Sequence, residues 1–68
     1  MKWTELEEFA EANGWHAPIA WKGGTASFAE ISRPRAGRGT CLVRGIGLSV
    51  GAAKRALCRA VQKIRAAR

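Results

Sequence analysis

The segment that follows Ser49 constrains the fold of this chain more than any other part of the sequence. Its apolar residues recur at every third or fourth position, which is the spacing of one face of an α-helix. These residues are Ala53, Ala56, Leu57, Ala60, Val61 and Ile64. Ser49 is a preferred N-cap residue. Half of the stripe is alanine, so the helix can approach a sheet closely. The pattern therefore predicts a C-terminal helix packed against a sheet.

A second amphipathic helix is predicted near the N-terminus. Thr4 and Glu7 have the spacing of a capping box, in which each side chain binds the other residue's backbone N–H. The apolar face that follows consists of Leu6, Phe9 and Ala10. Asn13-Gly14 indicates the end of the helix, because glycine readily adopts the left-handed conformation that closes one. Trp15 is then expected to fold back onto the apolar face, which favours a structural role.

Three short strands are predicted between the two helices. They cover residues 17–22, 26–32 and 40–46. Gly23-Gly24 is a two-residue hairpin signal, and residues 33–39 form a longer, basic connection. Phe28 and Ile31 lie three positions apart, so the pattern leaves open which face of the second strand is buried.

These elements predict one α+β domain over residues 1–68, with the element order αβββα. The strands are expected to form an antiparallel sheet with both helices packed on one face. The residues expected to be buried are Leu6, Phe9, Ala53, Leu57, Ala60 and Ile64. A chain of this length has room for one domain only.

No apolar run is long enough to span a bilayer, and the acidic, amphipathic start lacks the features of a signal peptide. We therefore expect a cytoplasmic protein without membrane contact. Cys41 and Cys58 are too few for a disulfide framework or a zinc site, and we interpret them as buried, reduced thiols. No metal or cofactor is expected.

Charge is unevenly distributed along the chain. The formal net charge is +7, all five acidic residues lie at or before position 30, and ten of the twelve Lys and Arg residues lie beyond it. A field of this kind attracts phosphate polymers and accelerates encounter with them. The charge favours a nucleic acid as partner, although a basic surface also promotes solubility alone.

Glycines flank the predicted start of the C-terminal helix, over residues 45–51. A dinucleotide-binding fold would need a parallel strand and an acidic residue after this helix, and the sequence has neither there. The start of a helix beside glycines still offers free N–H groups, which suit a phosphate.

This segment resembles the end of a double-stranded-RNA-binding domain, where a glycine-rich third strand leads into a serine-capped second helix. The residues that carry the resemblance are Gly45, Gly47, Ser49, Ala53, Lys54, either Ala56 or Leu57, and Ala60. Residues 6–11 and Asn13-Gly14 resemble the first helix of the same family. The resemblance implies recognition of RNA duplex by shape, with Glu8 in the minor groove and Lys54 on a phosphate.

The chain departs from that family at two of its RNA-contacting regions. Val50 and Gly51 stand where the family usually has two lysines directly after the serine. The loop between the first two strands is shortened to Gly23-Gly24-Thr25.

The chain also resembles the HicA-type toxin ribonucleases, which share this fold. Asn13-Gly14-Trp15 and Lys22-Gly23-Gly24-Thr25, followed by Phe28, carry this resemblance. Thr25 replaces the histidine of that family's nuclease centre, and its hydroxyl cannot act as a general acid or base near neutral pH. His16, the only histidine, has no evident acid–base partner. The resemblance thus implies a relative without catalytic activity.

The sequence therefore predicts a non-enzymatic protein that binds double-stranded nucleic acid, RNA first and DNA second, through its basic C-terminal helix. The residues predicted to bind are Lys54, Arg55, Arg59, Lys22 and Glu8. Trp3 and Trp21 are interpreted as packing residues. Two alternatives stay open: a phage-type or regulatory module that docks on and inhibits a host nucleic-acid-handling complex, and an inactive relative of the HicA toxins.

Overall fold

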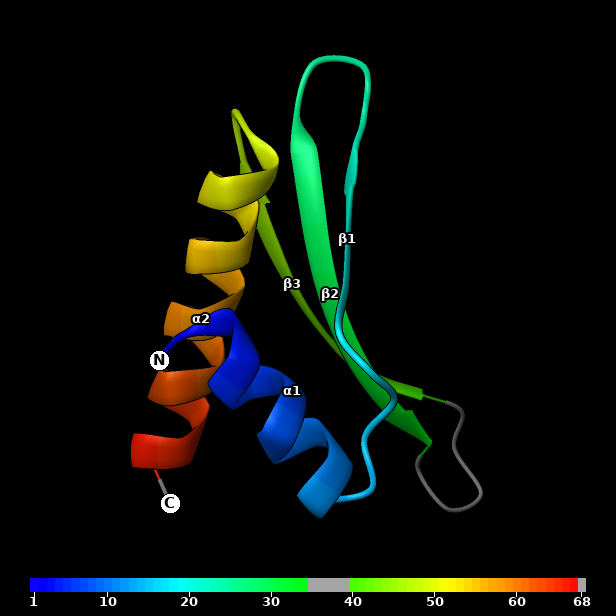
Figure 1. The fold of residues 1–68 in the computed structure, drawn as a ribbon, viewed down its shortest axis with the longest axis vertical. Coiled ribbons are helices and arrows are strands. Elements are labelled where there is room, and N and C mark those ends of the chain that lie inside the picture. The colour runs from blue at the N-terminus through cyan, green and yellow to red at the C-terminus, as the bar shows by residue number, and fades with distance from the viewer. Residues whose placement is uncertain (35–39, 68) are drawn as a thin grey trace.

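The protein is an α+β domain with the predicted element order, as a computed structural model that describes residues 1–34 and 40–67 shows (Figure 1). The elements are α1 (Trp3–Ala12), β1 (Ile19–Lys22), β2 (Ser27–Pro34), β3 (Thr40–Gly47) and α2 (Val50–Ala66). The basic connection was predicted over residues 33–39, but Arg33 and Pro34 belong to β2, and residues 35–39 lie outside the described residues. Within the described ranges, neither helix is long and apolar enough to cross a membrane.

The three strands form an antiparallel meander in the order β1-β2-β3. Both helices lie on one side of the sheet, and the opposite face is open (Figure 1). The predicted two-residue turn at Gly23-Gly24 is wrong by one position. The N–H of Gly23 donates to the carbonyl oxygen of Ala26 at 2.8 Å, so Gly24 and Thr25 occupy the tip of the loop.

Helix α2 packs directly on β3 because both surfaces are nearly free of side chains at the contact. Gly45 is buried, and a Cβ atom added to it would overlap the backbone of Leu57. A Cβ atom on Gly47 would lie 2.7 Å from the backbone nitrogen of Ala53. The small-residue face that the sequence predicts for the last helix is therefore matched by glycines on the strand.

The core lies between α2, α1 and the inner face of the sheet. Leu6, Ala53 and Leu57 are fully buried, as predicted. Phe9 and Ala60 are only half-buried. The prediction for Ile64 is wrong: its side chain is 46 % exposed, because the last turns of α2 border a hollow rather than a filled core.

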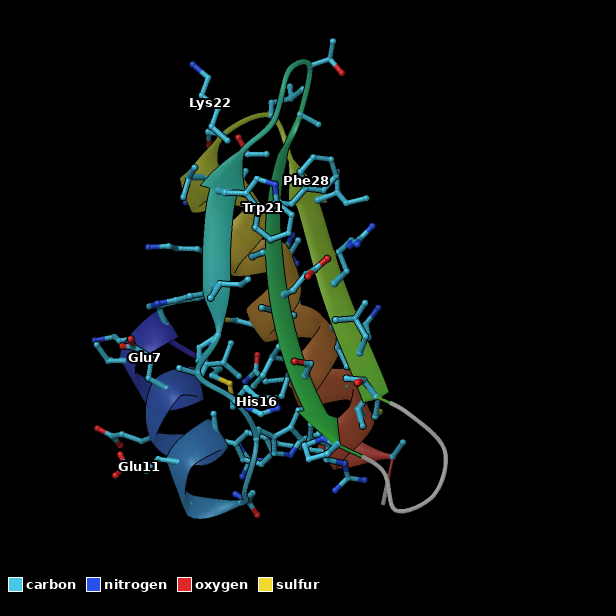
Figure 2. All side chains as sticks on the ribbon, turned by 90° about the vertical axis from the view of Figure 1, so that its right-hand side faces the viewer. Glu7, Glu11, His16, Trp21, Lys22 and Phe28 are labelled. Atoms are coloured by element: carbon cyan, nitrogen blue, oxygen red, sulfur yellow. The ribbon has the colours of Figure 1, made fainter. Side chains whose placement is uncertain are left out.

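The burial of β2 resolves the ambiguity at its two large apolar residues. Ala29 and Ile31 point toward the helices and are buried. Phe28 is half-buried and faces the open side, where its ring stacks on that of Trp21 with centroids 5.5 Å apart (Figure 2). Residues three positions apart on a strand lie on opposite faces of the sheet. An alternating pattern of buried and exposed residues therefore could not bury both Phe28 and Ile31.

The predicted capping box at Thr4 and Glu7 is wrong. A helix capped by Thr4 would begin at Glu5, whereas α1 begins two residues earlier, at Trp3. Lys2 is the N-cap residue, and its backbone N–H donates to Oε1 of Glu5 at 3.0 Å. The predicted helix end is present, since Gly14 has a φ of 74°. The N–H of Trp15 then donates to the carbonyl oxygen of Ala10 at 2.9 Å, and its ring lies 6.2 Å from that of Phe9.

Candidate nucleic-acid interface

The exposed side of α2 carries a row of cations. Arg55, Arg59 and Lys63 are spaced four residues apart, and all three are exposed. Residues at this spacing lie above one another on a helix, about 6 Å apart along its axis. Arg55 and Arg59 were predicted from the sequence. Lys63 was not, although its spacing from Arg59 is the signal that identifies it.

The cations of this row have no acidic partner within the part of the chain that the structure describes. The ion pair found there joins Arg44 and Glu30 on the other side of the sheet. The three charges on α2 are thus available to an external anion. Their electrostatic attraction is not offset by neighbouring carboxylates.

The start of α2 adds backbone donors to the end of this row. The hydroxyl of Ser49 accepts a hydrogen bond from the N–H of Ala52 at 3.1 Å, as its predicted N-cap role requires. The first intrahelical bond runs from Ala53 to Ser49, which leaves the N–H groups of Val50 and Gly51 without an intrahelical acceptor. Free N–H groups at a helix start favour an anion there.

Lys54 lies outside the row. Its ammonium nitrogen is 4.9 Å from the centroid of the Trp3 ring, and the residue is half-buried between α2 and α1. This cation–π contact is a structural role that sequence reasoning missed. Trp3 itself packs against the core, as the packing interpretation of that residue expects.

Lys22 and Glu8 lie at different ends of the molecule. Lys22 ends β1 beside the hairpin, and the start of α2 lies at the same end (Figures 1 and 2). Glu8 is exposed on α1, which runs alongside the C-terminal half of α2. The structure therefore groups Lys22 with the start of α2 and places the helix that bears Glu8 at the other half.

The open face of the sheet is largely apolar. Cross-strand pairing puts Trp21, Phe28 and Ile46 in one row across the three strands. Ile46 is 58 % exposed and Trp21 39 %. Beside this row, Nε of Arg44 donates to Oε1 of Glu30 at 2.6 Å, and the two side chains also form an ion pair. The apolar character of this face was not predicted from the sequence, because it depends on the pairing register of the three strands.

A hollow of about 310 Å³ lies between the end of α1, the inner sides of β2 and β3, and the last turns of α2. Its apolar lining consists of Phe9, Trp15, Ile31, Val43, Val61 and Ile64. Arg33 and Arg65 also border it. Each guanidinium lies over an aromatic ring, Arg33 at 5.0 Å from the Trp15 centroid and Arg65 at 4.9 Å from that of Phe9.

The residues of the HicA resemblance do not gather into a catalytic arrangement. His16 is exposed in the segment between α1 and β1, and Thr25 is exposed at the tip of the hairpin. The backbone of His16 donates to the carbonyl oxygen of Ser32 at 2.8 Å, which fixes this segment against β2. Among the described residues, no group of three His, Cys, Asp or Glu side chains is placed to hold a metal ion.

Both cysteines are free thiols. Cys58 is buried in the core, and this burial raises the pKa of its thiol above the ordinary value. Cys41 is only half-buried on β3, so the prediction of two buried thiols holds for one of them.

No family model, curated protein or solved structure matches this chain. The two family resemblances stay predictions.

Proposed function

We propose that this protein binds double-stranded nucleic acid, RNA in preference to DNA, through the exposed side of α2, and that it does so without catalysis. The observation that carries the proposal is the row of Arg55, Arg59 and Lys63, exposed and without a described acidic partner. Regularly spaced cations on a rigid helix suit the repeating phosphates of a duplex.

Two features beside the row support the same interpretation. The open N–H groups at the start of α2 offer a further phosphate contact, and Lys22 adds a cation at the same end of the molecule. Lys54 and Glu8 remain candidate contacts that the family resemblance implies. For Lys54, binding a phosphate competes with its contact to Trp3.

The test is a titration against duplex RNA, duplex DNA and the corresponding single strands at two salt concentrations. Counterion release makes the log–log slope of affinity against salt about −0.9 per phosphate contact on duplex DNA, hence roughly −3.6 for four contacts. Arg59→Ala should weaken binding to all sequences alike and flatten the slope by about one unit.

Arg44→Gln is the matched control, because it removes the same charge from the open face of the sheet, where Arg44 lies over the ring of Phe28. It should leave the slope unchanged. Lys54→Ala tests phosphate binding less directly than Arg59→Ala, because it also removes the contact with Trp3. Loss of that contact is expected to cost about 0.5–1 kcal/mol of folding free energy. Absence of duplex binding at about 50 mM salt, where phosphate contacts are strong, would refute the proposal.

The second candidate is a protein-interaction module of a phage-type or regulatory protein, which docks on a nucleic-acid-handling complex. The open sheet face favours it, because Trp21, Phe28 and Ile46 form an exposed apolar row. Substituting Ile46→Arg on that face should abolish such docking and leave duplex binding intact. The same two variants, Arg59→Ala and Ile46→Arg, thus separate the two candidates.

A further inference from the structure

The hollow beside the end of α1 differs from the rest of the core in being incompletely filled. Phe9, Trp15 and Ile64 border it, and none of the three is fully buried. Its volume of about 310 Å³ is within the range of small-molecule sites. Apolar walls of this kind gain free energy when an apolar group replaces the water that they contact.

Two cations stand at this apolar hollow. Arg33 comes from β2 and Arg65 from the last turns of α2, so residues far apart in the sequence converge there. Neither forms an ion pair within residues 1–34 and 40–67. Their guanidinium groups lie over the rings of Trp15 and Phe9, which places both groups at the lining of the hollow.

Arg33 also carries an unmet hydrogen-bond donor. Its Nε atom is buried and has no acceptor among the described residues. A buried donor without an acceptor is unfavourable. Because Nε is buried, a ligand can supply its acceptor only when the Arg33 side chain moves toward the hollow. The site therefore combines an apolar cavity with a demand for negative charge and hydrogen-bond acceptors.

We propose that this hollow binds a carboxylate attached to an apolar body, such as an aromatic or branched aliphatic acid. The apolar body fills the space between α1, the sheet and α2, and the carboxylate accepts hydrogen bonds from Arg33 and Arg65. The planar guanidinium fork matches the two oxygens of a carboxylate. A nucleic-acid strand would leave the apolar walls unfilled, so this site is separate from the row on α2.

Such a carboxylate has two possible sources, a free organic acid and the C-terminal residue of a polypeptide. The first probe is N-acetyl-phenylalanine, titrated into the whole chain labelled with ¹⁵N and followed by NMR. We expect a Kd of about 1 mM for a ligand of this size, with shift changes centred on the Trp15 indole and on Ile31 and Val61. The tripeptide Ala-Ala-Phe with a free C-terminus distinguishes the sources: tighter binding than the free acid assigns a polypeptide end, and equal binding assigns a small acid.

The neutral amide of N-acetyl-phenylalanine and plain acetate are the ligand controls. Both should bind at least tenfold more weakly, since one lacks the charge and the other the apolar body. Arg33→Gln and Arg65→Gln should each weaken binding of the acid several-fold and leave binding of the amide unchanged. Arg59→Gln removes the same charge from the exposed row on α2. It should change neither the binding of the acid nor the binding of the amide.

Arg65 is exposed, so Arg65→Gln should fold even if Arg33→Gln does not. The comparison of acid with amide needs no variant at all. Equal affinity for the acid and the amide would overturn the proposal that the hollow binds a carboxylate. Chemical-shift changes centred on the open sheet face would overturn it too. No detectable binding of the acid at about 20 mM, well above the expected Kd, would overturn it as well.

Discussion

Gly45 and Gly47 set how closely β3 approaches α2. At both positions the space that a methyl group would need is already occupied by α2, around Leu57 for the first and Ala53 for the second. Gly51, in the first turn of α2, has open space around it, since its Cβ would meet nothing closer than 3.5 Å, a guanidinium nitrogen of Arg55. Glycine is thus a packing requirement at two positions and not at the third.

We expect Gly45→Ala to destabilise the fold by about 1–3 kcal/mol or more, because the helix must move away from the strand. Gly51→Ala should instead stabilise it, by up to about 1 kcal/mol, because alanine is the better helix former. Urea unfolding of the two variants measures both changes. A neutral Gly45→Ala would mean that α2 and β3 are less tightly packed than described.

The two thiols should differ in reactivity. Burial raises the pKa of Cys58, so at a given pH less of it is present as the nucleophilic thiolate, while Cys41 is half-buried on β3. At pH 8, iodoacetamide should therefore alkylate Cys41 first, and Cys58 only after unfolding. Mass spectrometry of peptides from a time course gives the order. Faster modification of Cys58 in the folded protein would contradict it.

At the scale of the element, α2 is both the packing centre and the proposed binding helix. Its inner face holds Ala53, Leu57 and Val61 in the core, and its outer face carries the cationic row. Because the two faces do not overlap, charge on the outer side can be altered without disturbing the core.

Gly51→Lys introduces a lysine where the double-stranded-RNA-binding family, which this segment resembles, usually has one. The position is exposed, and the added side chain stands one turn before Arg55. We expect tighter binding to duplexes and a salt slope steeper by about 0.9 on DNA, as one further phosphate contact requires. Ala17→Lys adds the same charge beside Glu7 and Glu11, and it should leave the slope unchanged.

The elements differ in how much of them the sequence could predict. The end of α1 and the start of α2 depend on Gly14 and Ser49, whose conformations are local, and both predictions were confirmed. The predicted start of α1 was wrong because the side chain of Glu5, rather than that of Glu7, accepts the hydrogen bond from the backbone of the N-cap residue. Lys2 is not a preferred N-cap residue, so residue preference favours Thr4 and does not indicate the earlier start.

The parts of the site that sequence reasoning missed depend on tertiary placement. The exposure of Ile64 follows from the hollow left between α1, the sheet and α2, and helical periodicity carries no information on that fit. The convergence of Arg33 and Arg65 likewise requires the positions of β2 and α2 in space. The apolar row on the open face depends on strand register, which a hairpin shifted by one residue would have changed.

At the scale of the whole molecule, charge is separated between the two helices. Four of the five acidic residues lie on α1, and the outer side of α2 is basic. Glu7 and Glu11 lie together on the side of α1 that Figure 2 faces. If a duplex binds along α2 as proposed, one helix attracts it and the other repels it, which restricts its orientation.

Because the acidic residues lie together on α1, the predicted role of Glu8 can be tested by comparing its substitution with that of Glu11. If Glu8 contacts a minor groove as the family resemblance implies, Glu8→Gln should change affinity for duplex RNA more than affinity for duplex DNA. Glu11→Gln should raise affinity for both duplexes modestly, because it only removes a repelling charge. Identical behaviour of the two variants in the binding titration would leave Glu8 as part of the acidic field and exclude a groove contact.

The order of the strands has a consequence for how the chain acquires its structure. Each strand pairs with the next along the chain, and α2 packs on the strand directly before it, so these contacts close short loops and should form rapidly. Helix α1 makes the contact of longest sequence separation, since it packs beside α2 at the other end of the sequence. We therefore expect its docking to follow the assembly of the meander and α2. Amides of α1 are accordingly expected to open most readily from the native state, as a separate cooperative unit, while the rest of the domain stays folded.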